Sequence, residues 1–317
     1  MTAICVPDDA PPVLVNSAAW GELTGRAKVD YYDTLPGSEE RLVERVGGAE
    51  VVLNIRSSVK FTERVFAACP RLRMVSVWGT GTDHVDLAAA ARRGVTVANT
   101  PGVSATAVAE HTLALLLAAA RRIPQMDAAV RRSEWARGHS TDLAGKTCGV
   151  IGLGAIGREF ARLARGIGMR VIGWTMHPRE VAGVEMVQLE ELFRSSDVIS
   201  LHLRLSEETR GFIGAAQLAL MKPEAILVNT ARGGMVEEAA LREALGSGRI
   251  RAAALDVFAA EPLPADHAWR EVPNVVLTPH CAGISPTVME AGLRMAVENV
   301  WAFLEGRPRN LVGRVQL

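Results

Sequence analysis

The sequence has few cysteines and no excess of either charge. Four cysteines are scattered among 317 residues without a CxxC pair, at Cys5, Cys69, Cys148 and Cys281, which argues against a disulfide framework and a structural zinc site. Thirty-five basic side chains balance thirty-five acidic ones, so the electrostatic signature of a nucleic-acid-binding or membrane-surface protein is missing. We therefore expect a small-molecule partner, with no nucleic acid and no membrane.

Long apolar runs and metal-ligand spacings are also missing. The most apolar segment, Val103 to Ala120, carries Glu110 and His111 in its middle, which favours a buried helix over a membrane span. The N-terminal residues do not show a basic start followed by an apolar stretch. The histidines show no HExxH or comparable spacing, so we expect no metal site. Together with the scattered thiols, these features predict a cytoplasmic protein.

The sequence does contain an alternation of short apolar runs and longer helical patterns. Its length is roughly two domains' worth of protein, and two domains imply a cleft. A first series of β-rich runs covers residues 51–55, 73–77 and 95–99, and a second series follows Ala144: TCGVIG, RVIGWT, VISLHL, AILVNT, AAALDV and VVLTPH. Nearly continuous apolar runs of this length fit parallel strands covered by helices on both faces. A helix predicted over residues 104–123, closed by Pro124, separates the two series, and a helical pattern returns over residues 285–308.

Three glycines come directly after the first strand of the second series. Gly152, Gly154 and Gly157 lie between an apolar run and a predicted helix in VIGLGAIGREFARL. A pyrophosphate site needs one glycine for the turn, one for close approach of the backbone to the ligand and one for helix packing. The same spacing also occurs in a tight strand–turn–helix, so the interpretation depends on residues further along the chain.

Three ionisable residues each come just after a predicted strand of this series. Arg232 ends NTAR, Glu261 lies in LDVFAAEPLP and His280 ends VVLTPH. In a doubly wound sheet the carboxyl ends of the strands converge on the ligand crevice. An arginine binds a carboxylate bidentately, a histidine protonates a carbonyl oxygen as hydride arrives on its carbon, and a glutamate hydrogen-bonded to that imidazole favours its charged form. Each residue alone could be structural, but together they predict a reversible carbonyl reductase.

The order of the motifs GLGAIG, NTARGG, LDVFAAEPLP and TPHCAG, with GTGTDHVDL and ANTPGVSATAVAEHTLALLL before them, resembles the D-isomer-specific 2-hydroxyacid dehydrogenase family. The resemblance covers nearly the whole chain. It implies an α/β fold of two Rossmann- or flavodoxin-like doubly wound parallel-sheet domains. A dinucleotide-binding domain at 101–284 is then inserted into a discontinuous substrate domain, 1–100 plus 285–317. The resemblance also implies a homodimer formed through the cofactor domain and the helix at 104–123.

The resemblance assigns three catalytic roles. It makes His280 the acid/base, Glu261 the residue that orients it, and Arg232 the residue that binds the carboxylate and carbonyl of a 2-oxo acid. Backbone N–H groups at Thr80 and Gly81 are expected on the substrate carboxylate. The expected substrate-binding residues are Arg56, Ser57, Thr80, Gly81 and Arg232.

The cofactor site is also carried over from the family. Asp256 matches the acid that binds the nicotinamide carboxamide, and the alternative is that it caps the N-terminus of a helix. For the substrate residue Arg56, the alternative is a surface arginine with no role in binding. The expected cofactor-binding residues are Gly152, Gly154, Ala155, Ile156, Gly157, Thr175, Thr230, Ala231, Asp256 and Gly283.

Some positions depart from the family pattern. Thr175 stands where an acid about twenty residues past the glycines normally binds the ribose hydroxyls of NAD. No negative charge there would repel a 2′-phosphate. His177 and Arg179 follow Thr175 closely, and Arg204 stands where the family commonly has a proline beside the adenosine. We therefore expect NADP to serve at least as well as NAD. Cys281 replaces an aliphatic residue and is interpreted as a small packing residue rather than a nucleophile.

These observations predict an NAD(P)-dependent oxidoreductase that transfers hydride between the dinucleotide and a small 2-oxo acid or D-2-hydroxy acid, of the glyoxylate or hydroxypyruvate type. Arg56 and Ser57 leave a phosphoglycerate dehydrogenase-type activity as one alternative. A non-catalytic, dinucleotide-sensing protein similar to transcriptional corepressors of the family is another, and turnover distinguishes it from an enzyme.

Overall fold

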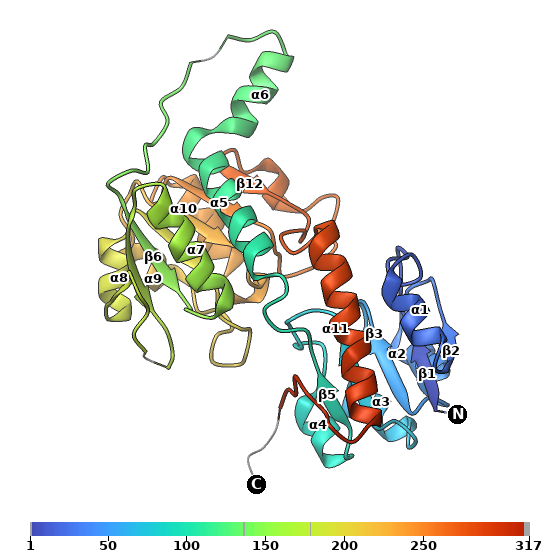
Figure 1. Cartoon of the computed structure of the whole chain (residues 1–317). Coiled ribbons are helices and arrows are strands. Elements are labelled where there is room, and N and C mark those ends of the chain that lie inside the picture. The colour runs from blue at the N-terminus through green and yellow to red at the C-terminus, as the bar shows by residue number, and fades with distance from the viewer. Residues whose placement is uncertain (1, 136, 178, 314–317) are drawn as a thin grey trace. The chain divides into compact units, whose positions relative to one another are not determined.

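The computed structural model describes residues 2–135, 137–177 and 179–313. The chain folds into two compact units: unit 1 comprises Met1–Ser104 and Ile284–Leu317, and unit 2 comprises Ala105–Gly283. Each unit is a parallel sheet with helices packed against it (Figure 1). The predicted fold class, two doubly wound α/β domains, is confirmed.

Unit 1 is built on a five-stranded sheet with the order β2-β1-β3-β4-β5. The pairings between these strands are parallel, and the order is that of flavodoxin-like sheets. Its strands are β1 (Ala3–Val6), β2 (Lys28–Tyr31), β3 (Val51–Asn54), β4 (Met74–Val77) and β5 (Thr96–Ala98). Its helices are α1 (Ala18–Thr24), α2 (Glu39–Val46), α3 (Glu63–Ala68), α4 (Leu87–Arg92) and α11 (Pro286–Leu304).

Helix α11 returns from the far end of the chain to complete the core of unit 1. Its buried face, which includes Leu293, Val297 and Val300, joins the cluster formed by β1, β3 and α1. The Ser76 hydroxyl in β4 donates a hydrogen bond of 2.8 Å to the carbonyl of Ala296. Figure 1 shows α11, coloured red, beside the blue elements α1 and β3. The core of unit 1 therefore depends on residues that come after the whole of unit 2.

Unit 2 is built on a seven-stranded sheet with the order β12-β11-β10-β9-β6-β7-β8. Its strands are β6 (Thr147–Ile151), β7 (Arg170–Trp174), β8 (Glu185–Met186), β9 (Val198–Leu201), β10 (Ile226–Asn229), β11 (Ala252–Leu255) and β12 (Val275–Leu277). The chain leaves β6 in one direction and later returns to its other side at β9, which creates a topological switch point. Ligands of such sheets bind at the carboxyl ends of the strands near this point.

Helices cover both faces of this second sheet. Alternate residues of β6 point to opposite faces: Val150 joins the core under α5 and α7, and Ile151 joins the core under α8, α9 and α10. The helices are α5 (Ala105–Arg121), α6 (Ile123–Arg131), α7 (Ala155–Gly166), α8 (Leu189–Ser195), α9 (Ala215–Leu220) and α10 (Glu238–Gly246), with 3-10 turns η1 (Gly233–Met235) and η2 (Ala268–Glu271).

Pro124 does not close the long helix as expected. Helix α5 ends at Arg121, Arg122 adopts a left-handed φ of 55°, and Pro124 lies in the first turn of α6, where its missing N–H costs nothing.

No helix among the described residues combines the length and the apolar character needed to cross a bilayer. The four cysteines are free thiols; Cys5, Cys69 and Cys148 are buried, and Cys281 is half-buried.

Candidate active site

The glycine loop joins the carboxyl end of β6 to the first turn of α7. Gly152 has a φ of 96°, and a Cβ there would lie 2.7 Å from the carbonyl oxygen of His202. A Cβ at Gly157 would lie 1.9 Å from the carbonyl oxygen of Gly152, whereas a Cβ at Gly154 would meet nothing within 4 Å. Two glycines are therefore required by packing. The third, which caps α7, faces open space at a helix N-terminus, which is the arrangement that fits a dinucleotide pyrophosphate.

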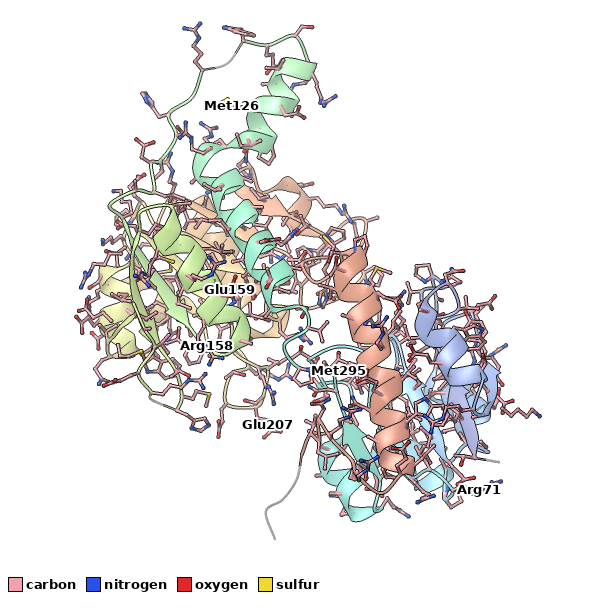
Figure 2. The ribbon with its side chains drawn as sticks, viewed as in Figure 1. Arg71, Met126, Arg158, Glu159, Glu207 and Met295 are labelled. Carbon is pink, nitrogen blue, oxygen red and sulfur yellow. The ribbon has the colours of Figure 1, made fainter. Side chains whose placement is uncertain are left out.

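Basic side chains lie next to this loop. The guanidinium groups of Arg158 and Arg179 both donate hydrogen bonds to the carbonyl oxygen of Leu153, that of Arg158 at 3.5 Å. Arg158, labelled in Figure 2, belongs to α7. Sequence reasoning missed it because spacing from the glycines does not tell toward which side of the helix its side chain points. Thr175 comes after β7 and is half-buried, and His177 is exposed. Arg204, in the segment after β9, is also exposed.

The predicted acid/base pair is in direct contact. Nδ1 of His280 lies 2.6 Å from Oε2 of Glu261, and Oε1 of Glu261 accepts a hydrogen bond of 2.9 Å from the N–H of Phe258. The backbone of His280 has a φ of 51°, and its N–H donates to the carbonyl of Asp256 at 2.7 Å. The His280 side chain is 43% exposed. Because Nδ1 is engaged by Glu261, Nε2 is the ring nitrogen left to exchange a proton with a ligand.

Arg232 completes this group from the neighbouring strand end. Its backbone carbonyl accepts a hydrogen bond of 2.9 Å from Asn229, and its Nη1 donates to the carbonyl of Ala231 at 2.8 Å. The next residue, Gly233, packs so closely that a Cβ there would lie 2.0 Å from the carbonyl carbon of Phe258. The loops after β10, β11 and β12 are therefore packed together, and they carry Arg232, Glu261 and His280.

The electrostatics of the pair result from these contacts. Burial raises the pKa of Glu261, but the hydrogen bonds from His280 and from the Phe258 N–H lower it, as do the charges of His280 and Arg232. The net pKa of Glu261 lies below its ordinary value. Glu261 is therefore ionised near neutral pH and is suited to hold a protonated imidazole.

Asp256 lies beneath the turn that presents His280. Its carboxylate is fully buried. It accepts hydrogen bonds from the Thr278 hydroxyl at 2.6 Å, and from the N–H groups of Cys281 and Ala282 at 2.9 Å each. No helix begins at this residue, so the alternative of a helix N-cap is wrong. His111 on α5 also reaches this carboxylate, with Nε2 at 3.6 Å from Oδ1. Sequence reasoning did not connect the two, because α5 precedes every strand of the sheet.

The other predicted cofactor residues lie on the same loops. The Thr230 hydroxyl, just after β10, is buried and lies 2.8 Å from the hydroxyl of Thr112 on α5. The N–H of Ala231 donates to Asn229 Oδ1 at 3.0 Å. Gly283 is the last residue of unit 2 and is half-buried.

In unit 1, Arg56 is held against its own unit. Its Nε and Nη2 donate to the carbonyls of Ala10 and Pro11 at 3.2 and 2.7 Å, and its guanidinium carbon lies 5.3 Å from the ring centroid of Trp78. Ser57 is exposed. Arg56 is therefore half-buried and fixed rather than a solvated surface arginine. This geometry suits an anion-binding residue that is already oriented.

A buried carboxylate fixes the backbone of this segment. Asp8 accepts hydrogen bonds from Asn54 Nδ2 at 2.5 Å, from the Ile55 N–H at 2.9 Å and from the Arg56 N–H at 3.1 Å. Asn54 Oδ1 in turn lies 2.8 Å from Nε2 of His84. Burial raises the pKa of Asp8 to about 7, although the N–H donors lower it. Sequence reasoning missed Asp8, whose only signal is its position as an acid after a short apolar run.

The loop with Thr80 and Gly81 is also held by side chains of unit 1. The N–H of Gly79, which has a φ of 137°, donates to the Thr100 hydroxyl at 2.9 Å. Asn99 Nδ2 donates to the carbonyl of Thr80 at 2.7 Å. Thr80 and Gly81 are half-buried.

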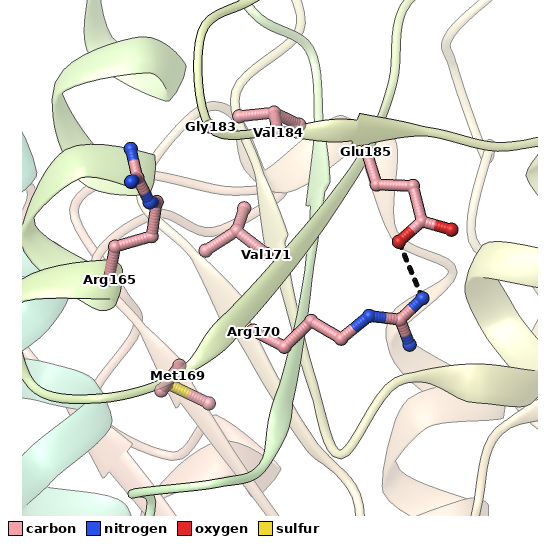
Figure 3. A pocket seen from close by; sticks show the side chains of 7 residues that line it. All are labelled: Arg165, Met169, Arg170, Val171, Gly183, Val184 and Glu185. Atoms are coloured by element: carbon pink, nitrogen blue, oxygen red, sulfur yellow. Dashed lines mark hydrogen bonds and ion pairs between the residues drawn. The ribbon is translucent and has the colours of Figure 1, made fainter.

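A hollow of about 490 Å³ lies elsewhere on unit 2 (Figure 3). Arg165 at the end of α7, Arg170 at the start of β7 and Glu185 of β8 are among its lining residues, and the last two form an ion pair of 2.5 Å. The glycine loop lies at the other end of α7. This hollow is therefore separate from the candidate active site.

Comparison with known proteins identifies the family. Residues 113–282 match the description "D-isomer specific 2-hydroxyacid dehydrogenase, NAD binding domain". The chain belongs to this family. It is 41% identical over 293 residues to a glyoxylate reductase of Korarchaeum cryptofilum, covering 89% of this chain and 88% of that protein.

It is also 43% identical over 276 residues to a D-3-phosphoglycerate dehydrogenase of Methanocaldococcus jannaschii, covering 85% of this chain and 52% of that protein. The chain thus spans about half the length of this relative. Among solved structures, an acyclic imino acid reductase in complex with NADPH and D-Arg is similar with a TM-score of 0.91 at 30% identity, covering 98% of this chain and 100% of that one. The predicted family resemblance is confirmed.

Proposed function

We propose that the protein is an NAD(P)-dependent reductase of small 2-oxo acids, reversible as a D-2-hydroxyacid dehydrogenase, of the glyoxylate or hydroxypyruvate type. The observation that carries this proposal is the His280–Glu261 contact of 2.6 Å beside the charge of Arg232. These residues come after neighbouring strands of a sheet whose β6 ends in a glycine loop open at Gly154. The glyoxylate reductase and phosphoglycerate dehydrogenase relatives support the same class of reaction.

The three side chains divide the chemistry between them. Arg232 binds the substrate carboxylate with its guanidinium fork and polarises the neighbouring carbonyl. A bound nicotinamide would supply the hydride for the carbonyl carbon. His280 donates the Nε2 proton to the carbonyl oxygen, so that hydride plus proton convert the 2-oxo acid into a 2-hydroxy acid. Glu261 accepts the hydrogen bond from Nδ1–H of the imidazole and so orients Nε2 toward the substrate.

Substrate and cofactor residues are proposed on the loops described above. Backbone N–H groups of Thr80 and Gly81, with Arg56 and Ser57, are assigned to the substrate. Asp256 is assigned to the nicotinamide carboxamide. The remaining cofactor contacts are assigned to Gly152, Gly154, Ala155, Ile156, Gly157, Thr175, Thr230, Ala231 and Gly283.

A panel of 2-oxo acids tested with NADH and NADPH decides the function. Oxidation of either reduced cofactor with glyoxylate or hydroxypyruvate is the expected result. Absence of turnover with every member of the panel would favour the alternative of a dinucleotide-sensing binding protein.

Phosphoglycerate dehydrogenase-type activity is the second candidate. The fixed position of Arg56 over Trp78 favours it, because a preorganised guanidinium binds a second anionic group such as a phosphate. Including 3-phosphohydroxypyruvate in the panel separates the two candidates. A kcat/KM at least tenfold above that for glyoxylate would identify the phosphorylated substrate.

We also propose that NADP(H) serves at least as well as NAD(H). Thr175 places no carboxylate at the end of β7, and Arg179 is anchored to the glycine loop through Leu153. The NADPH complex of the similar imino acid reductase agrees with this proposal. We expect a ratio of kcat/KM for NADPH over NADH of one or more, falling at least tenfold in Arg179→Ser.

Arg162→Ser is the matched control, because Arg162 lies exposed on α7 and pairs with Glu159 at 2.6 Å. A wild-type preference of tenfold or more for NADH would overturn the cofactor proposal.

A homodimer and a cytoplasmic location are proposed as well. Apolar side chains are exposed along α5, α6 and the segment after them, at Leu117, Ile123, Val130 and Trp135, the last of them 77% exposed. Figure 1 shows α6 projecting from the rest of unit 2. Several large apolar side chains exposed on successive elements favour a protein interface there. The four free thiols suit a reducing compartment.

A further inference from the structure

Three metal-ligating side chains meet beneath the catalytic turn of unit 2. His111 comes from α5, Asp256 comes just after β11 and Cys281 just after β12. Each offers one ligand atom, a nitrogen, an oxygen and a sulfur, and these three atoms all lie within 4.8 Å of one another. None of the three is assigned to proton transfer in the proposed reaction, and the thiol of Cys281 has no role in it at all.

The spacing is close to that of a single metal ion. Zinc bond lengths of about 2.0 Å to nitrogen or oxygen and about 2.3 Å to sulfur place tetrahedral ligand atoms roughly 3.3 to 3.6 Å apart. Nε2 of His111 already lies 3.6 Å from Oδ1 of Asp256. The thiol lies within 4.8 Å of both atoms, so it needs an approach of at most about 1.3 Å to complete three sides of a tetrahedron. The Thr278 hydroxyl, which lies 3.1 Å from Nε2 of His111 and donates to Oδ1 of Asp256 at 2.6 Å, gives up these two contacts when the ion binds.

The charges and accessibility also suit a divalent cation. Asp256 contributes one negative charge from a fully buried position, and Cys281 contributes a second once its thiol is deprotonated. Two ligand charges balance a dication, so occupation leaves no net charge buried. His111 and Cys281 are half-buried rather than fully buried.

We propose that His111, Asp256 and Cys281 form a binding site for a thiophilic divalent cation such as Zn²⁺, with water as the fourth ligand, and that its occupation inhibits the enzyme. Inhibition results because the ion occupies the Asp256 carboxylate that the nicotinamide carboxamide would otherwise engage. The inhibition rests on the proposed function, whereas the metal binding does not. Metal binding is therefore tested first, with cobalt and zinc on the protein without substrate.

The first experiment titrates the full, chelator-treated protein with Co²⁺ and monitors the thiolate-to-cobalt charge-transfer absorption. We expect one equivalent to produce this band, and Zn²⁺ to abolish it by displacement. Cys281→Ser should remove the band, and His111→Gln should weaken cobalt binding at least tenfold. The control is His267→Gln, which removes a different histidine–acid pair, His267 with Glu238 at 3.4 Å, and should leave the titration unchanged. An unaltered band in Cys281→Ser, or no band in the wild type, overturns the site.

The second experiment measures turnover at increasing Zn²⁺, with each variant compared with its own rate in the presence of chelator. We expect inhibition competitive with the reduced cofactor, and a zinc sensitivity at least tenfold weaker in Cys281→Ala. Cobalt binding without competitive inhibition would reject the inhibitory step alone. If no 2-oxo acid is turned over, the proposed function fails, and the cobalt titration still decides the metal site.

Discussion

At the scale of single residues, His280 is constrained in both its backbone and its side chain. Its backbone adopts a left-handed φ of 51°, and its imidazole contacts Glu261 at 2.6 Å. Left-handed backbone is costly for a residue with a Cβ and persists where the surroundings enforce it. The hydrogen bond from its N–H to the Asp256 carbonyl, and those from Cys281 and Ala282 to the Asp256 carboxylate, provide that enforcement.

The proton-donor role proposed for His280 predicts a specific kinetic defect. Replacing it by alanine removes the proton donor but leaves the glycine loop intact, so kcat should fall by about 10²- to 10⁴-fold while cofactor affinity stays within about twofold. Steady-state kinetics and a fluorescence titration with the reduced cofactor measure the two quantities. His139→Ala, at an exposed histidine, is the control. Near-normal turnover in His280→Ala would refute the assignment.

Asp8 predicts a pH dependence of stability. Its pKa is about 7 in the folded protein against an ordinary value of 3.8, so the folded state binds more protons between these values. Its contribution to the free energy of unfolding is therefore fully present below about pH 4 and lost as the pH rises through 7. For this group alone we expect a loss on the order of 3 kcal/mol between pH 5 and pH 8.

Asp8→Asn should flatten that dependence, because an amide does not titrate in this range. Chemical denaturation monitored by tryptophan fluorescence at the two pH values measures it. Asp33→Asn, at an exposed acid of unit 1, should keep the wild-type dependence. An equal loss of stability in wild type and Asp8→Asn would contradict the prediction.

The candidate site could be predicted only in part from the sequence. Arg232, Glu261 and His280 could be found because each comes soon after an apolar run, and the strand ends of one parallel sheet are known to converge. Asp8, Arg158 and His111 could not be found in this way. Their partners lie in other elements, and their positions depend on how those elements pack rather than on spacing within a motif.

At the scale of elements, the β6–loop–α7 unit separates two kinds of glycine. Gly154 has a φ of −66°, which alanine tolerates, and its Cβ would meet no protein atom within 4 Å. At Gly157 a Cβ would lie 1.9 Å from a backbone oxygen. Packing therefore requires a glycine at position 157 but not at position 154, where we propose that the open space holds a ligand.

A matched pair of substitutions tests this distinction. Gly154→Ala should cost at most about 1 kcal/mol of stability while raising the KM for the cofactor at least tenfold, because the methyl group enters the space assigned to the pyrophosphate. Gly157→Ala should destabilise unit 2 by about 1–3 kcal/mol or more. Thermal unfolding and cofactor kinetics are measured on both. An unchanged cofactor KM in Gly154→Ala would argue against the assigned role of the loop.

Most of the strands could be predicted from their apolar runs. The nine runs singled out in the sequence all form strands, whereas β1, β2 and β8 were missed. Strand β2 alternates between exposed and half-buried residues, and β8 has two residues, so neither carries a continuous apolar signal. Pro124 was misjudged because a proline that ends one helix is equally compatible with the first turn of the next.

At the scale of the whole molecule, the exposed apolar residues of α5 and α6 predict that a charge placed among them dissociates the proposed dimer. Val130→Asp places a charge at a side chain that is 57% exposed on α6. If this surface is the dimer interface, the mass measured by light scattering after gel filtration should fall from twice 33.9 kDa to that of one chain. Leu35→Asp, at an apolar residue of unit 1 that is 46% exposed, should remain dimeric. A wild-type monomer at micromolar concentration would contradict the homodimer.

The return of α11 to unit 1 has a consequence for how the protein is made. A ribosome that has synthesised residues 1–104 must add all of unit 2 before the helix that covers β3 and β4 can emerge. At 5–20 residues per second this delay is roughly 10 to 40 seconds. During that interval the first sheet has an uncovered apolar face, while unit 2, whose chain is continuous, can already fold. The nascent first segment is therefore the natural target for chaperones during translation.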